Sequence, residues 1–401
     1  MKSILTLILL VFASSVFAQF TNLSFETGNT MLVKEYLNLL KDKQVGIITN
    51  STGVDKTGKH IIDMLVENKV NVTRIFTPEH GFSADDTYKT SGIEIPVTSL
   101  YGSKYSFTKN DVSDVDVLVF DIQELGARFY TYTSTLYLTM QDAKKFGKEY
   151  IVCDRPSVAD IHNTEGFMLD ENFSSFVGKI PTPVVFGLTI GELAYYLNGE
   201  FVQNDKFKVI KMKDYDSNIK YENLMSTWIN PSPSITSIES ARLYPALCFL
   251  EGTSISEGRG TTTPFQVFGS PFVNNDALLK NLNDFNLQGI TFEKTEFVPD
   301  QSLLPSYTAM KFVSVVCYGV KLKVTDMFKF KPFQTSVAIL LALKNSSSKF
   351  TWTNKNFVDK LVGTNKLRTM IDNGSTLNEI ISESDKDTRD FKEKTKPYLL
   401  Y

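Results

Sequence analysis

Three consecutive segments of the chain decide its fold: DVLVFDIQE at 116–124, TSTLYLTMQDAKKFG at 133–147 and EYIVCDRPS at 149–157. The first and third are short apolar runs without polar alternation, which is typical of parallel strands covered on both faces. The middle segment has the spacing of an amphipathic helix. Together they predict a strand–helix–strand unit.

The same unit recurs on either side of these segments. QVGIITN at 44–50 and VTRIFTPEH at 72–80 are two more apolar runs, and GKHIIDMLVEN at 58–68 between them has a helical pattern. GLTIGELAYYLNGEF at 187–201 adds a helix that Thr189 is suited to cap. Alternating strands and helices predict a doubly wound α/β domain with a mostly parallel sheet.

The stretch GTSISEGRGTTTPFQVFGSP at 252–271 interrupts this alternation. Apolar runs bracket it and it carries Glu257 and Arg259, so we expect a long functional loop rather than a linker. After it come predicted strands at 289–299 and 315–324, a helix at 333–345 and a charged helical tail. We place a domain boundary near residue 272, which gives a first domain over 19–272 and a smaller one over 273–401.

The first twenty residues, MKSILTLILLVFASSVFAQF, have one early lysine, an apolar run and a small-residue end. This pattern predicts a signal peptide over 1–18, and therefore export to the periplasm or the exterior. Elsewhere we find no apolar stretch of the roughly 20 residues that a membrane span needs, so the mature chain should have no integral membrane segment.

Composition and motifs argue against several other classes of protein. The net charge of −3 gives no bulk attraction to nucleic acid or to an anionic membrane. No G-x-G-x-x-G follows the run at 44–50, so a dinucleotide site has little support. With three histidines and no metal-ligand spacing, we expect no metal site, and we predict no cofactor.

The three cysteines, Cys153, Cys248 and Cys317, are far apart, and each lies in an apolar run that resembles a core strand. This arrangement predicts buried thiols rather than a framework of disulfides.

Charged residues follow three of the four apolar runs: Glu79 and His80, then Asp121 through Glu124, then Asp154 and Arg155. In a doubly wound sheet these strand ends face one crevice. A carboxylic acid near a carboxylate is the arrangement that hydrolyses a glycosidic bond. Two structural alternatives stay open, because such carboxylates often cap the next helix and His80 can equally bond a backbone carbonyl.

Six motifs in order give a more specific indication: TPEHGF (77–82), FDIQELGARFYTYTSTL (120–136), CDRPS (153–157), GLTIGELA (187–194), NPSPSI (230–235) and LEGTSISEGRGTTTPFQVFGSPF (250–272). Over nearly the whole chain they resemble the exo-β-N-acetylmuramidases of glycoside hydrolase family 171. The resemblance implies a Rossmann-like catalytic domain, a smaller α+β C-terminal domain that completes a cleft, and release of terminal N-acetylmuramic acid from non-reducing ends of peptidoglycan fragments.

The resemblance also implies catalytic roles for Glu79 and Glu124. Glu79 of the PEHG motif is the leading candidate, as the general acid/base that protonates the leaving oxygen. Glu124 stands where the family more often carries aspartate, and it could be a nucleophile or a base. The 2-acetamido oxygen of the substrate could attack instead.

The lactyl carboxylate of N-acetylmuramic acid calls for a planar guanidinium. Arg259 and Arg128 are the best candidates, with Arg155 behind them, and structural ion pairing is the alternative for each. We expect Tyr130 and Tyr132 to alternate on an extended segment and face one side, where they could stack on or hydrogen-bond to a pyranose ring; packing in the core is an equal alternative. The remaining predicted contacts to the saccharide, or to those arginines, are His80, Asp121, Asp154, Glu165, Glu251 and Glu257.

One alternative function and one open question remain. A non-catalytic exported protein that binds muropeptides would carry much the same residues. The sequence predicts no oligomeric state.

Overall fold

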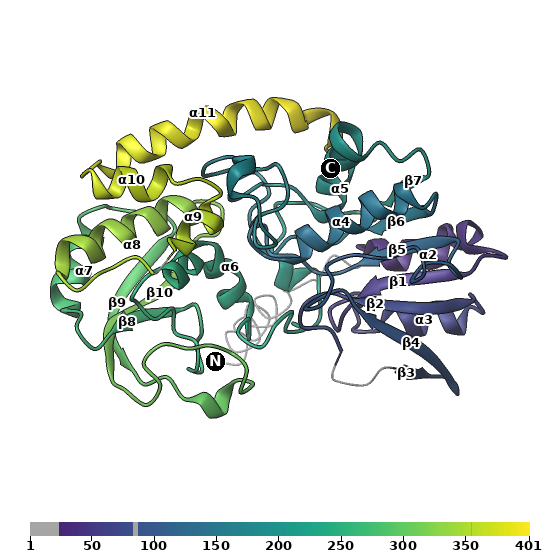
Figure 1. Cartoon of the computed structure of the whole chain (residues 1–401), viewed down its shortest axis with the longest axis horizontal. Helices are drawn as coiled ribbons and strands as arrows, with labels where there is room; N and C mark the ends of the chain where they lie inside the picture. The colour runs from purple at the N-terminus through teal and green to yellow at the C-terminus, as the bar shows by residue number, and fades with distance from the viewer. Residues whose placement is uncertain (1–23, 83–86, 354) are drawn as a thin grey trace, which may run out of the picture.

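The computed structural model describes residues 24–82, 87–353 and 355–401, so the predicted signal peptide at 1–18 lies outside the described residues. The first domain is built on a seven-stranded sheet of order β3-β4-β2-β1-β5-β6-β7 (Figure 1). Its strands are β1 Val45–Thr49, β2 Val72–Thr77, β3 Thr87–Thr90, β4 Ile93–Ser99, β5 Val117–Asp121, β6 Glu149–Cys153 and β7 Phe207–Ile210.

The strands β4, β2, β1, β5, β6 and β7 run parallel, and β3 joins the edge as an antiparallel partner of β4. The chain passes from β1 to β2 on one side and later returns to β5 on the other side of β1. This reversal makes the sheet doubly wound, which confirms the predicted fold class.

Helices cover both faces of this sheet because its strands are apolar on both sides. Ile47 packs with α2 (Gly28–Glu35) and α3 (Ile61–Glu67), while its neighbour Ile48 belongs to the core that includes α4 (Tyr132–Lys145) and α5 (Ile190–Leu197). Successive side chains of a strand point to opposite faces, so one apolar run contributes to both cores.

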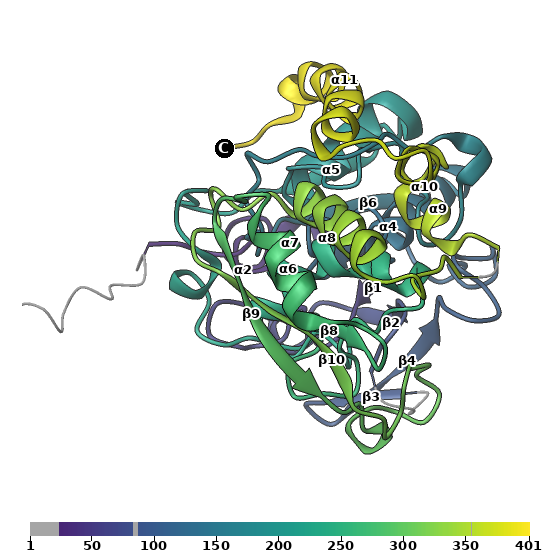
Figure 2. The ribbon, with the colours of Figure 1, turned by 90° about the vertical axis from the view of Figure 1, so that its left-hand side faces the viewer.

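The second domain holds a three-stranded antiparallel sheet of order β8-β10-β9, with helices packed against it (Figure 2). The helix α6 comes before our predicted boundary at residue 272, as does β8, and α6 packs against α8. The elements are α6 Ile238–Leu247, β8 Val267–Ser270, α7 Asn275–Asn283, β9 Ile290–Phe297, β10 Cys317–Val324, α8 Pro332–Ser346, α9 Phe357–Val362 and α10 Lys366–Asp372.

The last helix, α11 (Leu377–Thr395), runs from the second domain back over the first, where the chain ends (Figure 1). There the Tyr401 hydroxyl donates to Asp154 Oδ2 at 2.9 Å, and the Leu400 amide donates to Glu192 Oε1 at 2.9 Å. The C-terminus therefore ties the two domains together. No helix in the described part of the chain combines the length and apolar character of a membrane span.

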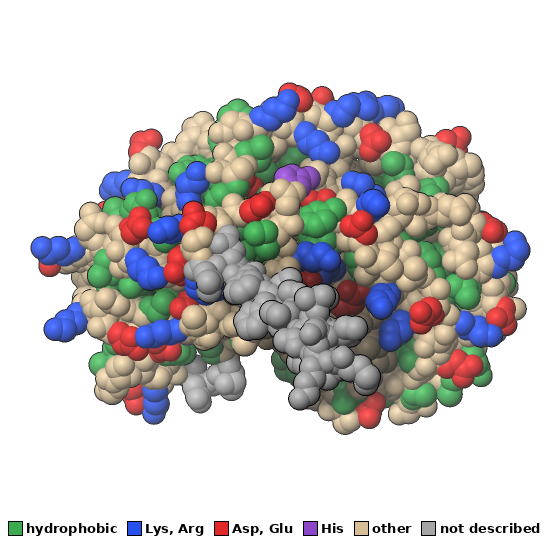
Figure 3. Space-filling model, turned by 180° about the vertical axis from the view of Figure 1, so that it is seen from behind, with side chains coloured by type: hydrophobic (Ala, Val, Ile, Leu, Met, Phe, Trp, Pro, Cys, Tyr) green, Lys and Arg blue, Asp and Glu red, His purple; other side chains and the backbone are tan. Residues whose placement is uncertain are grey.

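All three cysteines are free and buried, as predicted. The expectation that each lies in a strand is wrong for Cys248, which opens a short 3-10 helix after α6. On the surface, acidic and basic side chains alternate over the face shown in Figure 3, without a large area of one sign.

Candidate active site

A cavity of about 440 Å³ is lined by residues of both domains. The first domain contributes the ends of β2 and β4 and the approach to α4, and the second contributes the loops around 251–265 and 307–309. Its polar lining residues are Glu79, His80, Tyr101, Tyr130, Thr131, Ser232, Ser234, Tyr244, Cys248, Glu251, Arg259, Tyr307 and Thr308.

A tight turn at the end of β2 directs Glu79 into this cavity. Pro78 follows the last strand residue, Thr77, and cannot donate to a sheet ladder. His80 then adopts a left-handed backbone with φ of 56°. Gly81 passes so close to Thr77 that a Cβ at position 81 would lie 2.5 Å from the Thr77 Cβ. Gly81 is therefore required by the geometry of this turn.

The Glu79 carboxylate is held by groups from two other segments. Its Oε2 accepts a hydrogen bond of 2.8 Å from the Thr131 hydroxyl, which lies just before α4. Its Oε1 is 3.8 Å from His80 Nε2, and the Tyr101 phenol lies beside the same carboxylate. The Glu79 side chain keeps 18% of its surface exposed, so it is fixed in position and still open to a ligand.

Among the described residues that line the cavity, Arg259 supplies the guanidinium. Its NH2 group donates to Glu251 Oε1 at 2.6 Å, and its Nε is 3.7 Å from Glu257 Oε1. The guanidinium lies over the Phe265 ring at 5.3 Å from the centroid. Burial would lower the pKa of Arg259, but the carboxylates of Glu251 and Glu257 raise it above its ordinary value.

Burial lowers the pKa of His80 below its ordinary value of 6.5. The neighbouring Glu79 carboxylate opposes this shift, and the positive charge of Arg259 adds to it. His80 is therefore neutral at pH 7. A neutral imidazole can donate or accept one hydrogen bond beside Glu79 without adding charge to the cavity.

Five of the predicted site residues line the cavity together: Glu79, His80, Tyr130, Glu251 and Arg259. The other eight lie elsewhere, and most have structural partners. They are Asp121, Glu124, Arg128, Tyr132, Asp154, Arg155, Glu165 and Glu257.

Glu124 is buried in the turn that follows β5 and does not line the cavity. Its carboxylate accepts a hydrogen bond from the Gly126 amide. Burial raises the pKa of Glu124 to about 8, and the nearby Asp154 contributes in the same direction. Glu124 is therefore a neutral acid at pH 7 that stabilises its own turn.

Asp121 and Arg155 form an ion pair of 2.6 Å that is almost completely buried. Asn29 donates to the second oxygen of Asp121, and Arg155 also donates to the Val54 carbonyl. The pair sits next to the point where the strand order reverses, between β1 and β5. A doubly wound fold often binds ligands at that point, but here packed protein fills it.

Asp154 and Glu165 each accept a hydrogen bond from a backbone amide at the beginning of a helix. Asp154 Oδ1 accepts from the Gly191 amide at the start of α5, and burial raises the pKa of Asp154 to about 7. Glu165 Oε2 accepts from the Gln334 amide in the first turn of α8. The alternative of helix capping therefore describes both residues.

Arg128 is fully buried and bonds to main-chain carbonyls instead of a carboxylate. It donates to Phe167 and Thr182 in the first domain, and to Leu361 and Val362 at the end of α9. The end of a helix carries partial negative charge, which suits a cation. Arg128 therefore joins the domains.

The prediction of an extended segment at Tyr130 and Tyr132 is wrong, because the chain turns there and Tyr132 begins α4. The two rings meet edge to face at 4.6 Å. Tyr130 lines the cavity, whereas the Tyr132 hydroxyl donates to the Pro231 carbonyl inside the protein. Glu257 is likewise buried, and Lys311 Nζ donates to its Oε2 at 3.1 Å.

Several residues that line the cavity were not predicted from the sequence. Tyr244 carries no distinctive local pattern, and Tyr101 and Tyr307 lie on irregular loops. Three of the missed residues lie inside motifs quoted above: Thr131 between the two predicted tyrosines, and Ser232 and Ser234 in NPSPSI. In the described residues, no cluster of three or more His, Cys, Asp and Glu side chains could hold a metal ion.

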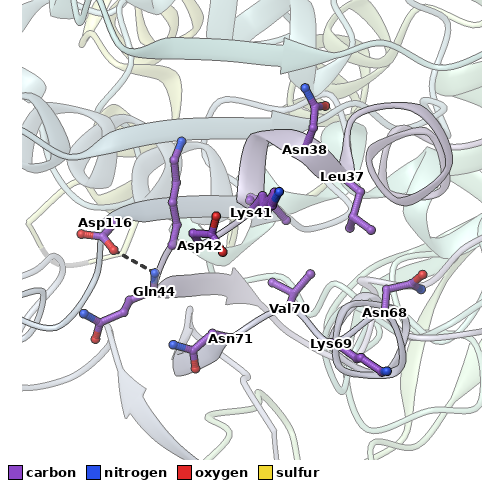
Figure 4. A pocket seen from close by; sticks show the side chains of 12 residues that line it. Leu37, Asn38, Lys41, Asp42, Gln44, Asn68, Lys69, Val70, Asn71 and Asp116 are labelled. Atoms are coloured by element: carbon purple, nitrogen blue, oxygen red, sulfur yellow. Dashed lines mark hydrogen bonds between the residues drawn. The ribbon is translucent and has the colours of Figure 1, made fainter.

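A second hollow of about 610 Å³ lies at the opposite edge of the sheet, where β1, β2 and β5 begin (Figure 4). Lysines, amides and two aspartates surround it, and Asp116 accepts a hydrogen bond of 2.8 Å from the Gln44 amide. It contains none of the predicted site residues. The cavity around Glu79 is therefore the candidate active site.

Comparison with known families agrees with this arrangement. The family model described as exo-β-N-acetylmuramidase NamZ, N-terminal, matches residues 45–239, and the corresponding C-terminal model matches residues 242–401. The change from one to the other coincides with α6, the first element that packs in the second domain.

The chain is 37% identical over 385 residues to the peptidoglycan β-N-acetylmuramidase NamZ of Bacillus subtilis, which covers 94% of this chain and 91% of the relative. Two crystal structures of DUF1343 family proteins from Bacteroides fragilis are also similar. One has a TM-score of 0.85 at 30% identity and covers 95% of this chain and 100% of its own, and the other has 0.77 at 31%, with 94% and 99%. The chain therefore belongs to the exo-β-N-acetylmuramidase NamZ family.

Proposed function

We propose that this protein is an exo-acting β-N-acetylmuramidase, a glycoside hydrolase that removes terminal N-acetylmuramic acid from the non-reducing ends of peptidoglycan fragments in cell-wall turnover or recycling. Family membership supports the proposal, and so does the relative's activity. The observation that carries it is the juxtaposition of the Glu79 carboxyl group and the Arg259 guanidinium in one cavity.

Arg259 is the group that would recognise the substrate. N-acetylmuramic acid differs from N-acetylglucosamine by a lactyl ether that ends in a carboxylate, and a guanidinium binds a carboxylate through two parallel hydrogen bonds. The Lys311 ammonium lies 3.1 Å from the Glu257 carboxylate and neutralises its charge. Glu257 therefore neutralises less of the positive charge of Arg259, which stays available to the substrate. Glu251 orients the guanidinium through its bond of 2.6 Å.

Glu79 would act as the general acid. It donates its proton to the glycosidic oxygen while the bond from C1 to that oxygen breaks, and positive charge develops on the sugar ring. If a nucleophile has first bonded to C1, the carboxylate that remains takes a proton from the water that displaces this nucleophile; if a second carboxylate acts as base, that carboxylate takes the proton from the attacking water. The hydrogen bond from Thr131 fixes the carboxyl group during both steps.

Glu124 lies outside the cavity, so another group must be the nucleophile or the second base. Two groups are available for this role. Glu251 is the other carboxylate among the described lining residues, and the substrate's own acetamido oxygen is the alternative. A substrate with an N-trifluoroacetyl group separates them. The rate should fall sharply if the amide oxygen attacks, and little if Glu251 acts as nucleophile or base.

Hydrolysis of a chromogenic β-N-acetylmuramide tests the proposed activity. The wild type should release the chromophore, and Glu79→Gln should lose at least about 100-fold in kcat while its melting temperature stays unchanged. Glu94→Gln is the matched control, since Glu94 is exposed on β4. A wild type that binds muropeptides but leaves them intact would favour the non-catalytic alternative, and equal turnover by Glu79→Gln would exclude Glu79 as the acid.

Export is a further part of the proposal. The apolar start of the chain supports a signal peptide, and the proposed substrate lies outside the cytoplasm. Fractionation of cells into cytoplasm, periplasm and medium, followed by N-terminal sequencing of the mature chain, tests both. Recovery of the uncleaved chain in the cytoplasm would contradict export.

A further inference from the structure

Three aromatic side chains form a cluster at the edge of the cavity. Tyr105 and Phe176 are stacked, with ring centroids 4.1 Å apart and an interplanar angle of 29°. Tyr101 lies 5.9 Å from Tyr105 and 5.8 Å from Phe176. Tyr101 also lines the cavity itself, as does Val177, the neighbour of Phe176. The cluster therefore continues the cavity wall outward.

The sheet fixes the position of this cluster relative to Glu79. Thr77 of β2 is paired with Ser99 of β4, and the Leu100 amide extends the pairing by donating to the Thr77 carbonyl at 2.8 Å. Glu79 and Tyr101 each lie two residues beyond that pair. The two side chains consequently lie next to each other at the same edge of the sheet.

Phe176 is also held rigidly. It occupies a two-residue turn whose flanking residues, Ser175 and Gly178, exchange both of their backbone hydrogen bonds at 3.1 Å. A platform on a tight turn and a strand end needs little ordering when a ligand binds, which favours affinity.

The cluster remains accessible in the folded chain. Tyr101 and Tyr105 each keep 42% of their surface exposed, and Phe176 is half-buried. If the three rings served only to join two loops, closer mutual burial would be expected of them. A contiguous exposed apolar group beside a cavity is typical of a binding surface.

We propose that Tyr101, Tyr105 and Phe176 form the subsite for the leaving group, a 2-acetamido-hexopyranose that stacks on these rings through the apolar face of its C–H bonds. This inference rests on the proposed function. Glu79 must lie beside the oxygen that it protonates, so the sugar that departs with this oxygen lies on the side of Glu79 next to Tyr101. N-acetylmuramic acid lies on the opposite side, toward Arg259.

Kinetics on two substrates test the subsite: the disaccharide N-acetylmuramyl-β-1,4-N-acetylglucosamine, and methyl β-N-acetylmuramide, whose leaving group is too small to stack. Tyr105→Ala and Phe176→Ala should each raise KM for the disaccharide about five- to tenfold. They should leave kcat/KM for the methyl glycoside within about twofold. Tyr105→Phe, which keeps the ring, should behave like the wild type.

Phe328→Ala is the matched control, because Phe328 is similarly exposed at 37% and does not line the cavity. This variant should change neither KM nor kcat/KM for either substrate. Equal losses on both substrates in Tyr105→Ala and Phe176→Ala would overturn the subsite in favour of a purely structural cluster. Unchanged KM for the disaccharide in both variants would overturn it as well.

A binding measurement separates failure of the subsite from failure of the proposed function. Saturation-transfer NMR with N-acetylglucosamine should give a signal with the wild type that Tyr105→Ala weakens at least fivefold. If the wild type hydrolyses neither glycoside but still shows this Tyr105-dependent signal, the subsite stands and the proposed function fails. If hydrolysis is normal and the signal does not depend on Tyr105, the subsite fails alone.

Discussion

Arg128 donates a hydrogen bond to the main-chain carbonyl of Val362, which lies 234 positions further along the chain. The same guanidinium bonds to carbonyls of Phe167 and Thr182, so three distant segments meet at one buried cation. Gly363 makes this contact possible, because a Cβ there would lie 2.4 Å from Arg128 NH2. The residue that the sequence offered as a ligand for the lactyl group is thus a connector between the domains.

Replacing Arg128 by methionine should lower the free energy of unfolding by about 3 kcal/mol or more, because several buried carbonyls lose their donor. Urea unfolding followed by circular dichroism measures this. Arg74→Met is the control, since Arg74 makes a partly exposed ion pair with Asp114, and it should cost less than about 1 kcal/mol. Equal losses in the two variants would contradict the role of Arg128.

Glu124→Gln should keep kcat/KM within about threefold of the wild type, because Glu124 is outside the cavity. It should also change how stability depends on pH. Burial raises the pKa of Glu124 to about 8, whereas an unfolded glutamate titrates near its ordinary value of about 4.3. Between these pH values the folded chain retains a proton that the unfolded chain has released, so Glu124 makes the free energy of unfolding fall as pH rises.

The glutamine variant lacks this titration. Relative to the wild type, it should therefore gain about 2–4 kcal/mol of stability between pH 5 and pH 8. Chemical unfolding of both proteins at pH 5 and pH 8 measures the difference in stability between them. Asp154 is present in both proteins, so its own titration cancels from this difference. A difference that does not change with pH would show that Glu124 is ionised in the folded chain.

Arg259→Lys should weaken recognition of the lactyl carboxylate, because an ammonium cannot reproduce the two parallel bonds of a guanidinium. We expect kcat/KM for a chromogenic N-acetylmuramide to fall about 10- to 100-fold. The same substitution should change kcat/KM little for the matching N-acetylglucosaminide, which has no lactyl group. That compound should be a poor substrate of both the wild type and the variant. An equal loss on both substrates would assign Arg259 to general positioning instead.

Asp121→Asn should destabilise the chain by about 3–5 kcal/mol, since it leaves Arg155 charged and without its counter-ion in the interior. The double variant with Asp121→Leu and Arg155→Met should recover most of that loss, and thermal melts of the single and double variants measure both. KM should not change in any variant that folds. A raised KM would show that Asp121 and Arg155 contribute to substrate binding after all.

Much of the fold was predictable because the apolar runs of parallel strands are local features of the sequence. The runs at 44–50, 72–80, 116–124 and 149–157 became β1, β2, β5 and β6, and Thr189 caps its helix as predicted, within a capping box that also uses Glu192. The strands β3 and β7 are only four residues long and do not stand out, and the packing of α6 depends on contacts with α8 that no local pattern encodes.

The site was harder to predict because strand ends serve two purposes. Glu79, Glu124 and Asp154 all follow apolar runs, but a strand end supplies either a group for a ligand or a cap for the next element. These residues differ in how deeply their carboxyl groups are buried. Glu79 leaves the sheet through a proline turn and stays 18% exposed, whereas Glu124 and Asp154 are at most 2% exposed. Depth depends on residues that pack over the strand end from distant parts of the chain.

The anchoring of Tyr401 has a practical consequence for handling the protein. Its hydroxyl accepts from the Met212 amide at 2.7 Å and donates to Asp154, so this hydroxyl is bonded to buried groups of the first domain although 39% of the residue is exposed. Carboxypeptidase trimming during purification would remove that anchor and one of the donors to the buried Asp154, which would keep its bonds from Thr189 and Gly191. Preparations with ragged ends would then contain a mixture of molecules with and without this bond between the domains.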